Sequence, residues 1–87
     1  MKNQNTNNIK LKTGLIIQEA RNGKQMSRKK LLCELEEYGI SLSMDALKSY
    51  ETGRINIPSA TLFVIAHILD LDLNSLKSAI GNELKKI

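Results

Sequence analysis

Signals that begin and end helices recur at short intervals in this sequence, and they restrict the chain to a series of short helices. Ser27 and Ser43 are good N-terminal caps, and Pro58 fits the first turn of a helix but cannot continue one. Gly39 and Gly53 are typical of residues that follow a helix end. Between these positions leucine and isoleucine recur every three or four residues, which is the period of a helix packed on one side. The pattern predicts an all-α fold.

The same signals predict a compact bundle of five helices. We expect these at about residues 13–22, from the Ser27 cap to the Gly39 stop, at 44–51, at 59–69, and from near Leu73. The pair Asn22-Gly23 is expected to end the first helix. Residues 1–10 are polar and asparagine-rich without periodicity, so we expect a disordered arm there. Residues 11–77 would then form the folded domain, and residues 78–87 a C-terminal helical extension.

The chain is short, and its composition requires an aliphatic core. Its 87 residues make one domain at most, and Tyr38, Tyr50 and Phe63 are its only aromatic residues. Among the residues of the third helix, Leu47 is the best candidate for the core. The fourth helix is expected to bury the face that includes Ile65.

The charge of the chain permits a polyanionic partner. The net charge is +4, and basic residues concentrate between Lys10 and Lys30, where Glu19 is the only acidic residue. A solvated basic face is the alternative interpretation of this run. The distribution is therefore compatible with a nucleic-acid partner but does not establish one.

The sequence contains no set of side chains typical of a metal site or a catalytic site. Cys33 is the only cysteine and His67 the only histidine, which excludes a disulfide framework and zinc-type ligand sets. We expect Cys33 to be a small buried hydrophobe and His67 to be a surface or packing residue. No nucleophile with a base and an orienting group is present, and no apolar run suits a signal peptide or a membrane span of ~20 residues. The prediction is a cytoplasmic protein without enzyme activity, metal or cofactor.

Several segments together resemble the Cro/CI-type helix-turn-helix family of DNA-binding domains, also called the xenobiotic response element family. The resemblance extends over about residues 13–76. It rests on Arg21 before the Gly23 turn, Ser27 opening one helix, Glu51-x-Gly53 closing the next, Pro58 opening another, and Ala66-x-x-Leu69 before Leu76. It implies a lambda-repressor-like bundle in which the second and third helices form the helix-turn-helix.

The resemblance also implies a structural ion pair. In this family the arginine that matches Arg21 commonly pairs with the glutamate that matches Glu51, and the pair ties the first helix to the recognition helix. Glu51 would then be structural and would not face DNA, where phosphates would repel its carboxylate.

The third helix would be the recognition helix in the major groove of DNA. Its base-reading positions match Met44, Asp45 and Ser49, with Lys48 between them. Met44 offers apolar contact, Asp45 could accept a hydrogen bond from a cytosine amino group, and Ser49 suits several bases. The target sequence is therefore not readable from this helix.

Phosphate contacts are expected where the second helix begins and around the third. The backbone amides that open the second helix form an anion site, and polar or basic side chains can flank the groove. The residues in question are Ser27, Arg28, Lys29, Lys30, Thr52 and Arg54, and Ser43, the cap of the third helix, is also expected at the DNA interface. The connection between Leu31 and Ser43 is longer than in the shortest members of the family, and its acidic pair Glu36-Glu37 must point away from DNA.

An apolar stripe near the C-terminus predicts an interface. Ile80, Leu84 and Ile87 continue the helical spacing beyond what so small a core can bury. We interpret the stripe as a homodimer contact, which would match palindromic half-sites about one helical turn, ~34 Å, apart. Gly81 and Asn82 interrupt the stripe, so a frayed extension is the alternative.

These observations predict a transcriptional regulator, in particular a repressor, that binds a palindromic operator in double-stranded DNA as a homodimer. The alternative is an antitoxin-like helix-turn-helix protein whose main role is to bind a partner protein through the C-terminal stripe.

Overall fold

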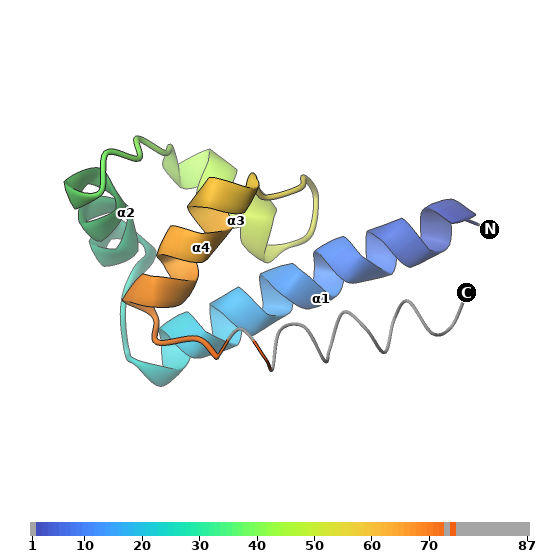
Figure 1. Ribbon diagram of the computed structural model, residues 1–87, viewed down its shortest axis with the longest axis horizontal. Coiled ribbons are helices and arrows are strands. Elements are labelled where there is room, and N and C mark those ends of the chain that lie inside the picture. Colours follow the sequence, from blue (N-terminus) through green and yellow to red (C-terminus); the bar gives the residue numbers. More distant parts are fainter. Residues whose placement is uncertain (1, 73, 75–87) are drawn as a thin grey trace.

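Four helices make up the part of the chain that the computed structural model describes, which is residues 2–72 and 74. They are α1 (Lys2–Gly23), α2 (Arg28–Glu37), α3 (Met44–Glu51) and α4 (Ser59–Ile68). This part is all-helical and contains no strand, as the sequence predicts. α1 is the longest element, and it runs past the other three helices toward the N-terminus (Figure 1). The fifth helix expected from near Leu73, and the stripe residues Ile80, Leu84 and Ile87, lie outside the described residues.

Side-chain caps begin the second and third helices as the sequence predicts. The hydroxyl oxygens of Ser27 and Ser43 accept hydrogen bonds from the backbone N–H groups of Lys30 and Ala46, each at 3.0 Å. Such a cap satisfies one of the amides that a helix leaves unpaired at its start. α4 follows Pro58 without a side-chain cap. The bounds of α3 are those expected from the sequence, since its signals are local.

All four helices end in one motif, in which the residue after the cap adopts a left-handed backbone conformation. These residues are Gln25 (φ 55°), Gly39 (φ 81°), Gly53 (φ 74°) and Asp70 (φ 54°). The N–H group after each of them returns to a helix carbonyl, namely Met26 to Arg21, Ile40 to Leu35, Arg54 to Ser49 and Leu71 to Ala66, at 2.8–3.0 Å. The first helix ends at Gly23, as expected from the pair Asn22-Gly23, and the left-handed residue that follows its end is Gln25.

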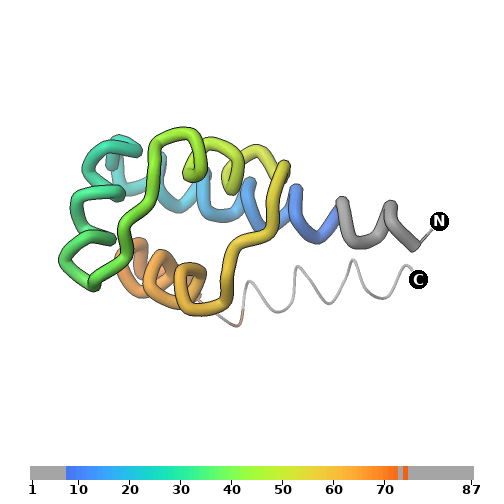
Figure 2. The backbone as a smooth tube through the Cα atoms, turned by 90° about the horizontal axis from the view of Figure 1, so that it is seen from above, coloured from blue at the N-terminus to red at the C-terminus, as the bar shows by residue number. Residues whose placement is uncertain are grey.

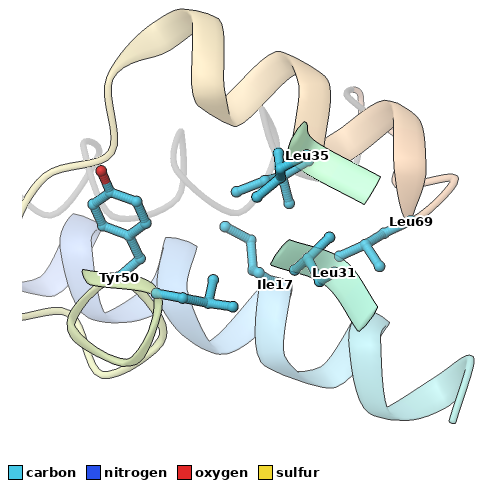
Figure 3. Packing of buried hydrophobic residues seen from close by; sticks show 7 residues of the cluster. Ile17, Leu31, Leu35, Tyr50 and Leu69 are labelled. Carbon is cyan, nitrogen blue, oxygen red and sulfur yellow. The ribbon is translucent and has the colours of Figure 1, made fainter. Parts of the chain in front are cut away.

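The core is aliphatic apart from one tyrosine. Ile17 of α1 lies in a cluster of buried side chains to which the other three helices also contribute (Figure 3). The fully or almost fully buried members are Ile17, Leu31, Leu35, Leu47, Tyr50, Ile65, Ala66 and Leu69. Burial of each large aliphatic side chain contributes about 1.5–3 kcal/mol. Leu47 and Ile65 have no exposed surface, which confirms both as core residues.

Two parts of the chain differ from expectation. Residues 2–10, expected as a disordered arm, form the start of α1. No proline interrupts this segment, and Ile9 lines a hollow of about 180 Å³ together with Ile55 and Leu62, so tertiary contact supports a sequence with little apolar signal. Cys33 is exposed and not buried. Leu31 and Leu35, four residues apart, occupy the core face of α2. Cys33 lies midway between them in the sequence, so its side chain points to the opposite side of the helix.

The segment between α3 and α4 crosses over α1 (Figure 2). Gly53 lies so close to α1 that a Cβ atom there would approach the Cα atom of Leu11 to 2.7 Å. Ile55 and Ile57 line the hollow beside Ile9. The end of α3 is therefore held against the middle of α1.

Candidate nucleic-acid interface

One side of α3 is buried and the other forms a polar surface. Leu47 and Tyr50 fill the core, whereas Asp45 and Lys48 are exposed and Ser49 is half-buried. A shallow hollow on this outer side is lined by Asp45, Lys48, Ser49, Thr52 and Arg54. The structure thus brings together five of the residues that the sequence singled out. Met44, 36% exposed, precedes them at the start of the helix.

The last turn of α3 positions the polar residues of this hollow. The Thr52 hydroxyl donates to the carbonyl oxygen of Lys48 at 2.8 Å. The Arg54 amide donates to the carbonyl of Ser49 at 2.9 Å, which places Arg54 directly after the helix end. With Gly53 pressed against α1, this turn has little freedom to move.

A buried ion cluster connects the end of α3 to the first two helices. Arg21 makes a bidentate contact with the Glu51 carboxylate: Nε donates to Oε2 at 2.7 Å and Nη2 donates to Oε1 at 3.1 Å. Its Nη1 atom donates to the carbonyl oxygen of Met26 at 2.7 Å. The Glu51 side chain is completely buried and that of Arg21 is 8% exposed. The expected ion pair is therefore present. Its bidentate geometry fixes the orientation of the two side chains as well as their distance.

A second arginine, for which no such role was expected from the sequence, also holds this carboxylate. Arg28 Nε donates to Glu51 Oε1 at 2.9 Å, and the Arg28 side chain is 28% exposed. Arg28 was expected only as a phosphate contact. Because it is the first residue of α2, its bond to Glu51 places the start of α2 beside the last turn of α3.

Close helix packing further fixes α3, through a glycine that sequence reasoning overlooked. A Cβ atom on Gly14 of α1 would lie 2.7 Å from the carbonyl oxygen of Glu51, and it would collide with the carbonyl oxygen of Tyr50. α1 and α3 are thus in backbone contact at this point. An isolated glycine inside a helical pattern was the available signal, because it often marks a close approach of two backbones.

The start of α2 carries three cations in succession, of which Arg28 and Lys30 are paired with Glu51 and Glu34. Lys29 and Lys30 follow Arg28, and the first turn contains no acidic residue. Lys29 is exposed, and Lys30 is 3.8 Å from Glu34 one turn later. Cations are unfavourable at the positive end of a helix dipole, so this turn attracts anions. Glu36 and Glu37 are exposed at the opposite end of α2.

His67, the only histidine, lies apart from the polar surface of α3. His67 is exposed and its ring meets Tyr38 edge to face, with centroids 5.7 Å apart. Within the described ranges, no group of three His, Cys, Asp or Glu side chains is arranged to hold a metal ion. None of the helices there has both the length and the apolar character needed to cross a membrane.

Comparison with known proteins gives no match: no protein-family model, curated protein or solved structure matches this chain.

Proposed function

We propose that this protein binds double-stranded DNA and regulates transcription, with α2 and α3 as a helix-turn-helix and α3 as the recognition helix. The observation that carries the proposal is the two-sided character of α3. Its inner side is buried and fixed by Glu51 and Gly14, while its outer side presents a hollow with two cations and two hydroxyls. A rigid helix with donor groups on its free side suits insertion into the major groove.

The distribution of charge supports the same proposal. Lys48 and Arg54 lie along the hollow, and Lys29 lies in the first turn of α2, which Arg28 joins to α3. Phosphate contacts from such cations would supply most of the affinity, and they would make it depend on salt. Asp45 is the one acid of the hollow. At a base edge it could accept a hydrogen bond from cytosine, whereas at a phosphate it would be repelled.

Selection of short duplexes from a random pool tests this proposal. The wild-type protein should enrich a common motif, and a palindrome would indicate a repressor-like homodimer. Lys48→Ala should change the preferred motif. Lys12→Ala should leave it unchanged, because Lys12 is an exposed lysine of α1 outside the proposed contacts. Recovery of unrelated duplexes by the wild-type protein would contradict the proposal.

A second candidate function, binding of a partner protein, is favoured by the composition of α4. This helix, SATLFVIAHI, contains no acidic residue, lysine or arginine, yet Phe63 on its outer side is 59% exposed. Tyr38 nearby is 52% exposed and contacts His67. An exposed aromatic side chain on a largely apolar helix is typical of a surface that a partner covers. Phe63→Ser should weaken binding of a co-purified partner without altering DNA affinity if this second function is correct.

A further inference from the structure

The two arginines that hold Glu51 differ in how many of their nitrogen atoms the fold uses. Arg21 donates from Nε, Nη1 and Nη2, all to groups inside the domain. Arg28 donates only from Nε, and among the described residues no acceptor binds either of its Nη atoms. Its side chain is 28% exposed, against 8% for Arg21. Arg28 can therefore bind Glu51 and an external anion at the same time.

The charge around this cluster also favours an external anion. Two guanidinium groups share one carboxylate, so the cluster carries a net positive charge. Through Arg28, this positive charge lies at the first turn of α2. The backbone amides there carry a partial positive charge, and none of the residues of that turn is acidic. A phosphate beside the Nη atoms of Arg28 would relieve the repulsion between the cations of this turn.

We propose that Arg28 positions the recognition helix in response to the DNA backbone: its Nη atoms bind a phosphate at the start of α2 while its Nε atom holds Glu51 at the end of α3. This inference rests on the proposed function. Arg28 would then act on base recognition through Glu51, without touching a base itself. Because coupling between two sites is reciprocal, a correct base contact at α3 would strengthen the phosphate contact at Arg28 by the same factor.

Arginine holds two separate anions in a fixed geometry, which lysine does not. Its planar guanidinium carries donors on separate edges, whereas the ammonium group of lysine is a single point charge. Lysine at position 28 would keep the attraction to phosphate but would lose the connection from phosphate to Glu51. This difference separates the two roles of Arg28 experimentally.

The experiment measures the affinity of four proteins for two DNA duplexes at several salt concentrations. The duplexes are the motif enriched by the wild-type protein and a scrambled duplex of the same length and composition. The proteins are the wild type, Arg28→Ala, Arg28→Lys and Lys29→Ala. Circular dichroism identifies a temperature at which each protein is folded. Lys29 is the matched control because it is the adjacent exposed cation and, within the described part of the chain, has no ion pair.

Lys29→Ala should weaken both duplexes alike and leave the ratio of their affinities unchanged. Arg28→Ala should reduce the slope of log affinity against log salt concentration by about 0.9, the value for one phosphate contact. It should also lower the ratio of the affinity for the enriched motif to that for the scrambled duplex by about fivefold or more. Arg28→Lys should keep the wild-type slope but show the lowered ratio. Arg28→Lys therefore carries the test even if Arg28→Ala does not fold.

Each other outcome overturns the inference in a recognisable way. If Arg28→Ala and Arg28→Lys keep the wild-type ratio, Arg28 is a simple phosphate contact. If Arg28→Ala lowers the ratio without changing the salt slope, the role of Arg28 is structural only. If the wild-type protein binds neither duplex, the proposed function fails and the inference fails with it.

Discussion

Replacement of Arg21 by methionine tests whether the buried ion cluster holds α3 in place. The substitution keeps much of the side-chain volume but removes the fork on Glu51, whose side chain is completely buried. Loss of one partner of a buried ion pair typically costs about 3–5 kcal/mol when the other charge is left uncompensated, and we expect the lower part of this range here because Arg28 still donates to Glu51 Oε1. A chain of 87 residues has a total stability on the order of 4–13 kcal/mol. Arg21→Met should therefore remove a large fraction of the stability.

Urea unfolding followed by circular dichroism measures this loss as a shift of the midpoint at constant slope. Lys24→Met is the matched control. Lys24 Nζ and Asp70 Oδ2 form an ion pair at 2.9 Å, but their side chains are 37% and 81% exposed. Because water screens this pair, the urea midpoint of Lys24→Met should stay close to that of the wild type. A double variant, Arg21→Met with Glu51→Leu, should recover part of the loss, because it removes the buried carboxylate that only Arg28 would still hold and because Arg28 is partly exposed to water. If Arg21→Met shifts the midpoint no further than Lys24→Met does, the reasoning about the cluster is wrong.

Three further predictions concern the packing of α1, a helix end and acid sensitivity. Gly14→Ala should destabilise the domain by about 1–3 kcal/mol or more in the same urea titration, because the added Cβ atom would collide with the α3 backbone. Gly23→Ala is the control: its Cβ atom would have no neighbour within 4 Å, and the substitution should stabilise the domain by about 0.5–1 kcal/mol. Gln25→Gly should raise the thermal midpoint, with a gain of about 1 kcal/mol, because glycine adopts the φ of 55° without strain; an unchanged or lower midpoint would refute this. The hydrogen bond from Lys24 lowers the pKa of Asp70 below its ordinary value of 3.8, so its stabilising effect is present above that pH and is lost as the pH falls through the lowered pKa. Because this pair is exposed, the effect is small: Lys24→Ala should lose slightly less stability than the wild type between neutral pH and pH 3, and a larger loss in Lys24→Ala would count against this ion pair.

The middle of the fold could be predicted from the sequence because its signals are local. The hydroxyls of Ser27 and Ser43 cap the helices that follow them, and Gly39 and Gly53 adopt the left-handed conformation that glycine favours. Such signals need only a few neighbouring residues. The inner side of α3 was predictable for the same reason, since Leu47 follows the helical period of the core.

The start of α1, the left-handed residue after its end and the role of Arg28 could not be predicted in this way. The start of α1 is polar and carries little periodicity. At its other end Gln25 adopts a conformation that its residue type does not favour. The bond from Arg28 to Glu51 joins residues 23 positions apart, and it depends on how α2 meets α3. These features depend on tertiary packing between residues far apart in the chain, which a local sequence pattern does not predict.

The measurement that tests the central proposal most directly is nuclear magnetic resonance mapping of the DNA-binding surface. The isotope-labelled wild-type protein would be titrated with the duplex enriched from the random pool. We expect the largest shifts of backbone amide signals at the start of α2 and along α3, including Lys29, Lys48 and Arg54. Amides around Phe63 should change little. Shifts concentrated around Phe63, with those of α3 unaffected, would contradict the assignment of α3 as the recognition helix.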